Sequence, residues 1–205
     1  MTGTWVEGWE EKLAALEIRA GGHQKREEGV CVMEAVAWLR NQEHTDKPVC
    51  VSQVIGDFMR SWNDGLPSDA ERNRLLKPLL PVIVDTVAND EIELRRSYMA
   101  LDWLVRVHCP AFLSLTDSLK AHAMALSGLA PITDEKSLEA AMPILGKAKS
   151  DAYAAWDAAG DAAGDAAGDA AWAAAWAAAR AALKPTVVQL QDSASDLVRR
   201  MAAEP

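Results

Sequence analysis

The sequence predicts an all-α protein with a compact multi-helix N-terminal body, followed by a long alanine-rich helix and a C-terminal return helix that together form a helical hairpin. Apolar residues recur every three or four positions, capping and breaking residues separate these stretches, and alanine dominates from Asp151 to Leu183. We place the body at residues 1–128 and the hairpin at residues 129–205, and the hairpin could pack on the body as one domain.

Start and stop signals define the helices expected in the body. Pro48 suits the first position of a helix, where its missing amide costs nothing. Ser68 and Glu71 form a capping-box pattern, in which each side chain pairs with the backbone amide of the other residue. Pro78 and Pro81 should interrupt the helix that follows. The expected helical segments are 5–18, 27–39, 48–65, 68 onwards, 89–108 and 112–126.

In the alanine-rich segment a glycine, tryptophan or arginine falls every four residues from Trp156 to Arg180. Each interior glycine costs about 1 kcal/mol relative to alanine, and close approach of another helix could offset that loss. We expect Lys184 and Pro185 to end the helix, so that residues 187–201 fold back along it. The alternative is a low-complexity spacer whose glycines have no specific role. The predicted interface, within the chain or in a homo-oligomer, consists of Gly160, Gly164, Gly168, Trp172 and Trp176.

Composition argues against several classes of function. The formal net charge of -9 disfavours polymeric nucleic acid as a partner, because that binding depends on basic residues that neutralise phosphates. No apolar run approaches the roughly 20 residues of a membrane-spanning helix, and the N-terminus lacks the order of a secretory signal. The three cysteines are an odd number, which fits a reducing compartment better than a disulfide framework. We therefore expect a cytoplasmic protein that does not bind membranes.

Glu34 is an unusual polar residue because it interrupts the apolar stripe of the helix expected at 27–39. A carboxylate on an inward face must be paired or neutral. One interpretation is a structural ion pair with an arginine, for which Arg60, Arg96 and Arg106 are candidates. The other is a ligand-facing acid in a polar cavity shared with His44 and Arg106.

Arginine and tryptophan residues further along the body suggest an anion site. Arg95, Asp102 and Arg106 share a broad face of the helix expected at 89–108. Salt bridging between Asp102 and Arg106 explains part of this pattern. Two arginines beside tryptophan would equally clamp a phosphate or carboxylate and stack a planar group. The predicted ligand-binding residues are Glu34, His44, Trp62, Arg95, Arg96, Asp102, Trp103 and Arg106.

Metal or thiol chemistry is a further alternative. Cys31, Cys50, His23, His44 and Glu34 carry atoms that could bind a metal, but no Cys or His pair has the spacing of a zinc site. Cys50 could act as a nucleophile with His44 as its base, although a thiol near a helix start is usually inert. We predict no cofactor, no metal and no catalytic residue.

Several stretches of the chain are distinctive, namely GGHQKREEGVCVMEAVAWL, EHTDKPVCVSQVIGDFMRSWND, RRSYMALDWLVR, AAWDAAGDAAGDAAGDAAW and PTVVQLQDSASDLVRRM. In them the chain resembles a family of alanine-rich helical proteins found in actinobacteria and actinobacteriophages. The resemblance covers most of the chain and implies a helical architecture in a bacterial host cell. It transfers no catalytic residue, because the family has no established activity.

These sequence features lead to three hypotheses for the function of the chain. In the first, the chain is a non-enzymatic binding protein, encoded by a phage or its host, that sequesters a small anionic, nucleotide-like ligand or interferes with a host process. In the second, it is a protein-interaction or scaffold module that binds a host protein or self-associates through the Gly/Ala/Trp helix. In the third, it is a metal- or cysteine-dependent hydrolase built on Glu34, His44 and Cys50.

Overall fold

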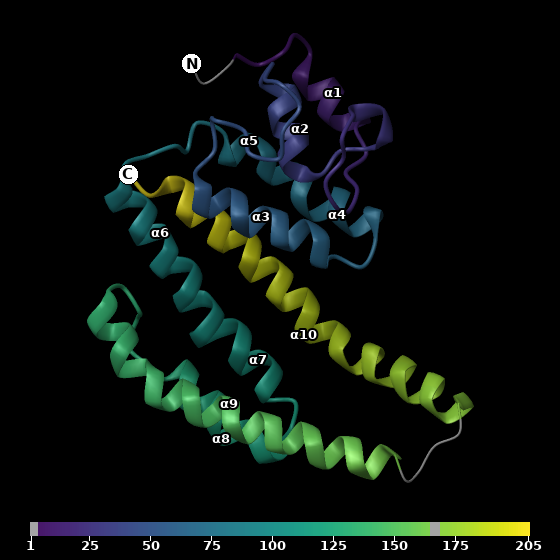
Figure 1. Ribbon diagram of the computed structural model, residues 1–205, viewed down its shortest axis with the longest axis vertical. Helices are drawn as coiled ribbons and strands as arrows, with labels where there is room; N and C mark the ends of the chain where they lie inside the picture. The colour runs from purple at the N-terminus through teal and green to yellow at the C-terminus, as the bar shows by residue number, and fades with distance from the viewer. Residues whose placement is uncertain (1–3, 165–168) are drawn as a thin grey trace. The chain divides into compact units, whose positions relative to one another are not determined.

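The computed structural model describes residues 4–164 and 169–205, with side chains described for residues 4–157 and 181–205. Helices make up nearly all of the regular structure in these ranges (Figure 1). The one β-type pairing among the described residues is an isolated parallel bridge between Ile18 and Val30. The predicted all-α class is confirmed.

The chain divides into two compact units, one of residues 1–97 and 195–205 and the other of residues 98–194. These limits differ from the division at residue 128 suggested by the sequence. One reason is that the helix beginning at Asp90 continues into the second unit. The other is that the last residues of the chain belong to the first unit.

The first unit is built from short helices around a fully buried apolar core. Met33, Leu39, Ile55, Met59 and Leu76 have at most 1% of their surface exposed. The helices are α1 (Trp9–Ala15), α2 (Val32–Leu39), α3 (Gln53–Gly65), α4 (Asp69–Leu76), α5 (Leu80–Ile83) and the start of α6 (Asp90–Trp103), with 3-10 turns at Arg26–Glu28 and Lys77–Leu79.

The first two helices are shorter than the sequence suggests. α1 ends at Ala15, because the chain then leaves the helix and the amide of Arg19 donates to the carbonyl of Val30 at 2.9 Å. α2 begins at Val32 instead of residue 27. The preceding Gly29 has a φ of 135°, a conformation that glycine adopts readily and other residues do not.

Of the helix starts predicted from capping signals for α3 and α4, the first is wrong and the second is correct. α3 begins after Ser52, whose hydroxyl accepts from the amide of Ile55 at 3.3 Å, and not at Pro48 as expected. The predicted start at Ser68 is confirmed, since its hydroxyl accepts from the amide of Glu71 at 3.2 Å. The interruption at Pro78 and Pro81 is also present, as the 3-10 turn and α5.

The second unit has its own core, formed by Val105, Leu126, Ile132, Ala141 and Ala148. The helix that enters it does not stop before Pro110, as the sequence suggested. It widens into a π-helical stretch at Leu104–His108 and continues as α7 (Cys109–Leu113). The wider turn accommodates a proline ring that would otherwise crowd the carbonyl four residues earlier. The remaining elements are a 3-10 turn (Asp117–Leu119), α8 (Lys120–Ser127), α9 (Glu135–Gly164) and α10 (Asp169–Ala203).

Two long helices, α9 and α10, carry the described part of the alanine-rich segment. α10 runs through Pro185 without ending, so the expected helix break there is wrong. Alanine and leucine precede the proline, and after it the helix buries Leu190, Ala194 and Leu197, so helix propensity on one side and packing on the other offset the hydrogen bond that proline removes. α9 is described as far as Gly164 and α10 from Asp169 onwards.

Candidate functional site

The candidate site begins at the N-terminus of α2, where Cys31 caps the helix. The Cys31 sulfur accepts from the amide of Glu34 at 3.4 Å, and the Glu34 carboxylate accepts from the amide of Cys31 at 2.7 Å. This reciprocal pair is a capping box in which cysteine takes the usual place of serine or threonine. Glu34 therefore enters the core because it satisfies an amide at the helix start.

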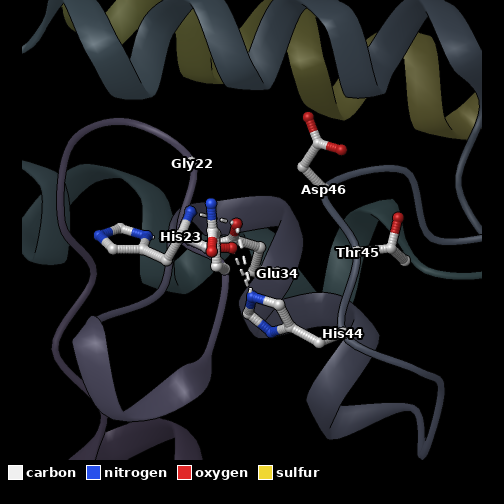
Figure 2. Close-up of a pocket in the computed structure, with 7 residues that line it drawn as sticks. Gly22, His23, Glu34, His44, Thr45 and Asp46 are labelled. Atoms are coloured by element: carbon white, nitrogen blue, oxygen red, sulfur yellow. Dashed lines mark hydrogen bonds and ion pairs between the residues drawn. The ribbon is translucent and has the colours of Figure 1, made fainter.

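The same carboxylate binds His23, which lies in the loop before α2 (Figure 2). Glu34 Oε1 accepts from the backbone amide of His23 at 2.8 Å, and Glu34 Oε2 contacts the imidazole Nδ1 at 3.0 Å. Only 3% of the Glu34 side chain is exposed. The structure thus pairs Glu34 with a histidine and backbone amides, whereas the sequence interpretation of a structural pair named an arginine.

His44 joins this cluster from the loop between α2 and α3. Its Nε2 donates to the carbonyl oxygen of His23 at 2.7 Å and lies 3.7 Å from Glu34 Oε1. Because a carbonyl can only accept, the hydrogen bond requires a proton on His44 Nε2. Three segments that are separate in the sequence therefore meet at one carboxylate.

The hydrogen bonds decide the ionisation of Glu34. Burial alone would raise its pKa, but the donors from His23 and Cys31 outweigh burial and lower the pKa below its ordinary value of 4.5. Burial, with the nearby Glu34 charge, raises the pKa of the Cys31 thiol to about 12. At neutral pH the site thus contains an ionised carboxylate and a protonated thiol.

An open cavity of about 500 Å³ lies at this cluster (Figure 2). Besides Glu34 and the two histidines, polar groups of Gln24, Thr45 and Asp46 line it. Asp46 is half-exposed and lies 3.8 Å from the guanidinium of Arg60. The seven lining residues are Gly22, His23, Gln24, Glu34, His44, Thr45 and Asp46.

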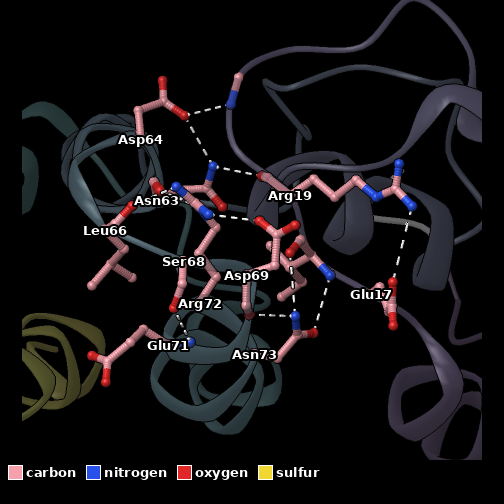
Figure 3. Close-up of polar contacts among 12 residues, drawn as sticks. Glu17, Arg19, Asn63, Asp64, Leu66, Ser68, Asp69, Glu71, Arg72 and Asn73 are labelled. Carbon is pink, nitrogen blue, oxygen red and sulfur yellow. Dashed lines mark hydrogen bonds and ion pairs between the residues drawn. The ribbon is translucent and has the colours of Figure 1, made fainter.

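A network at the end of α3 fixes the loop that carries His23 (Figure 3). The fully buried Asn63 donates to the carbonyl of Arg19 at 2.9 Å and accepts from the amide of Val32 at 3.2 Å. Asp64 accepts from the amide of Gly21 at 2.8 Å, two residues before His23. These contacts bind both the loop that carries His23 and the start of α2 to the C-terminal end of α3. The two segments that contain His23 and Glu34 are therefore held in place by the same residues.

Arg72 and Asn73 extend this network onto α4 (Figure 3). Arg72 donates to the carbonyl of Asn63 at 2.7 Å and pairs with Asp69 at 2.6 Å. Asn73 accepts from the amide of Ile18 at 3.0 Å and donates to its carbonyl at 3.2 Å. The segment before His23 is therefore attached to two helices of the first unit.

Of the predicted ligand-binding residues, the structure brings Glu34 and His44 together, and the cavity lining among the described residues contains no arginine. Arg96 is 2% exposed and donates to the backbone carbonyls of Thr86 and Met201. Arg95 pairs with Glu204 at 3.0 Å. These two arginines hold the C-terminal end of this chain against α6.

The other predicted residues lie elsewhere. Asp102 pairs with Arg106 at 3.0 Å, as the salt-bridge interpretation expected, and also accepts from the amide of Ile132 at 2.8 Å. Trp103 donates through its indole nitrogen to Ser193 at 2.9 Å. All of these belong to the second unit. Trp62, in the first unit, packs edge-on against Phe58, with ring centroids 6.1 Å apart.

The surroundings of Cys50 do not favour the thiol hypothesis. Its side chain is fully buried, and burial raises the pKa of the thiol. Its closest polar neighbours include Gln42, Arg40 and Asp85, whereas His44 bonds to His23. A protonated, buried thiol is a poor nucleophile.

The predicted interface residues are only partly described. Gly160 and Gly164 lie in α9, and Trp172 and Trp176 lie in α10, in a stretch whose side chains are outside the described set. Gly168 lies outside the described residues. The close approach of two helices over these glycines stays a prediction.

Three general findings complete the description. Among the residues whose side chains are described, 4–157 and 181–205, no group of three His, Cys, Asp or Glu is placed to hold a metal ion. None of the described helices combines the length and apolar character needed to cross a membrane. Comparison with known protein families, with curated proteins and with solved structures gives no match to this chain.

The capping role of Glu34 and the role of His23 were missed in the sequence. Cys31 and Glu34 have the same three-residue separation as Ser68 and Glu71, and both pairs precede an apolar run. The first pattern was overlooked because cysteine is not a usual capping residue. Nothing local in the sequence connects His23 to Glu34, since the loop between them is closed by the network on Asn63.

Proposed function

We propose that the chain is a non-enzymatic binding protein that holds a small anionic ligand in the cavity beside Glu34, His23 and His44. The observation that supports it is the convergence of these three side chains, from three separate segments, on one open cavity. A source in actinobacteria or their phages, and interference with a host process by sequestering the ligand, belong to the same proposal.

The charges at the cavity favour an anion once the histidines are protonated. Glu34 is already compensated by two amides and by His23, so it repels an incoming anion less than a free carboxylate would. Arg60 pairs with Asp46 and also with Asp57, so these three groups add no positive charge to the cavity, and the attraction for an anion comes from the histidines. A protonated imidazole donates from both ring nitrogens and carries a positive charge, so each histidine that is protonated makes the cavity more positive.

Calorimetric titration with inorganic phosphate and with adenosine monophosphate, at pH 8, 7 and 6, tests the proposal. We expect affinity for at least one probe to increase as the pH falls. His44→Gln keeps a donor for the His23 carbonyl but removes the titratable charge, so it should weaken binding at pH 6 by roughly tenfold, as for one charge-assisted hydrogen bond. His122→Ala is the control, because it removes a histidine paired with Asp151 in the second unit.

Two outcomes contradict the proposal. One is the absence of binding of either probe at millimolar concentration, together with no ultraviolet-absorbing small molecule released by heating protein purified from its native source. The other is tighter binding at pH 8 than at pH 6, or equal loss of binding in His44→Gln and His122→Ala.

A further inference from the structure

Three large apolar side chains of α9 are exposed, although the helix also packs into the core of the second unit. Met142, Tyr153 and Trp156 are 53%, 62% and 73% exposed. At about 100° per residue, these three positions lie within an arc of roughly 60° on the helix. Ala141 and Ala148, which lie about 100° around the helix from the centre of this arc, are buried in the core of the second unit. Aromatic side chains exposed together on one helix face are typical of a contact surface.

The residues on this face are arranged symmetrically about Tyr153. Lys149 lies four residues before it and Asp157 four residues after it. Both charged residues are exposed, and the Lys149 ammonium lies 6.0 Å from the Tyr153 ring centroid. Gly146 and Gly160 occupy helix positions seven residues before and after Tyr153. Reversing the direction of the helix therefore exchanges a cation with an anion and one glycine position with another.

We propose that this face is the contact surface of a homodimer, in which α9 packs antiparallel against α9 of a second copy around a two-fold axis at Tyr153. In that arrangement Lys149 of each copy lies opposite Asp157 of the other, which gives two attractive pairs. A parallel arrangement would place lysine opposite lysine and aspartate opposite aspartate. The self-complementary charge pattern is what a two-fold symmetric interface requires.

The proposal is independent of the ligand cavity, because α9 lies in the second unit and the cavity lies in the first. It also moves the predicted self-association from Trp172 and Trp176 to Tyr153 and Trp156. Other occupants of the same face, such as a helix of this chain or of another protein, give different results in the experiments below.

Light scattering on the full chain, at concentrations from about 1 to 100 µM, is the first test. We expect a mass that approaches twice the 22.1 kDa of the chain. Tyr153→Glu and Tyr153→Lys each place two like charges at the axis, so each variant alone should be monomeric. An equimolar mixture of the two should regain the dimer, because unlike charges then meet. Val49→Glu is the control, since Val49 is 64% exposed in the other unit.

A charge exchange is the second test. Lys149→Glu alone and Asp157→Lys alone each create two like-charged pairs, and each should weaken dimerisation by roughly tenfold. The double variant Lys149→Glu with Asp157→Lys should restore the affinity of the original chain. A chain that is monomeric at every concentration, a dimer that persists in Tyr153→Glu, or a double variant weaker than both single variants would overturn the proposal. If this face instead contacts a helix of the same chain, the protein will be monomeric at every concentration.

Discussion

The loops around Glu34 and the helix α9 are held in place by different physical means. The loops contain little regular secondary structure, and their positions depend on hydrogen bonds to Glu34 and Asn63. Both of these side chains are almost completely buried. α9 is one long helix, rich in alanine, that satisfies its own backbone and uses one face for packing. The first region should therefore be sensitive to single polar substitutions, whereas the second should tolerate changes on its exposed face.

The largest effect is expected for Glu34→Leu. The substitution leaves the amides of Cys31 and His23 and the imidazole of His23 without their acceptor in a buried place. We expect the free energy of unfolding to fall by about 3–5 kcal/mol. Urea unfolding followed by circular dichroism measures it. Glu17→Leu is the control, because the Glu17 side chain is 76% exposed. A loss below about 1 kcal/mol would show that the loops do not depend on this carboxylate.

Gly29→Ala should have the next largest effect. A Cβ added at this glycine would lie 2.8 Å from Nε2 of His23 and 2.9 Å from Cδ of Arg19, at a φ of 135°. The His23 ring cannot move freely, because Glu34 binds it. We expect a loss of about 2 kcal/mol in the free energy of unfolding. Gly65→Ala is the matched control, since nothing lies within 4 Å of its added Cβ. Equal losses in both variants would contradict the close approach at His23.

A pH dependence should follow from the ionisation of Glu34, with a smaller effect. Its pKa is lowered in the folded state, so the ionised carboxylate stabilises the fold above its ordinary value of 4.5. That contribution is lost as the pH falls through the folded-state pKa. The stability difference between the original chain and Glu34→Gln should therefore shrink as the pH falls below 4.5. A difference that grows under acid conditions would mean that the neutral form of Glu34 is favoured.

Trp156→Ala should have the smallest effect on folding. Trp156 is 73% exposed, and alanine is the better helix former. At concentrations where the chain is monomeric, we expect the free energy of unfolding to change by less than about 0.5 kcal/mol. Thermal unfolding of dilute protein measures this. A large destabilisation would mean that Trp156 packs against its own chain, and the contrast between the two regions would disappear.

The sequence was informative where structure is local. Helical periodicity, the cap at Ser68 and the prolines at 78 and 81 could be recognised because each depends on neighbouring residues. The break expected at Pro185 was wrong, since the helix after the proline is held by the burial of residues such as Leu190 and Leu197, which the local sequence does not show. In the candidate site, the interruption of an apolar stripe by Glu34 was visible, and so was the presence of His44 in the following loop.

The partners of Glu34 could not be predicted in the same way. His23 reaches it because Asn63, Asp64 and Asn73 fasten the intervening loop to α3 and α4, and this depends on contacts between residues more than forty positions apart, such as Asn63 with Arg19. The arginines looked like an anion clamp because pattern alone cannot distinguish an external anion from a carbonyl of the same chain. Arg96 binds two such carbonyls.

The cap of α2 by a cysteine gives this protein an internal chemical probe. Cys31 is 3% exposed, and burial raises the pKa of its thiol to about 12, so a thiol reagent cannot react with it while the first helical turn stays closed. Its rate of alkylation therefore measures how often that turn opens. Because the same turn holds Glu34, a ligand that occupies the neighbouring cavity should slow the reaction, and the bound state could be followed without introducing a label.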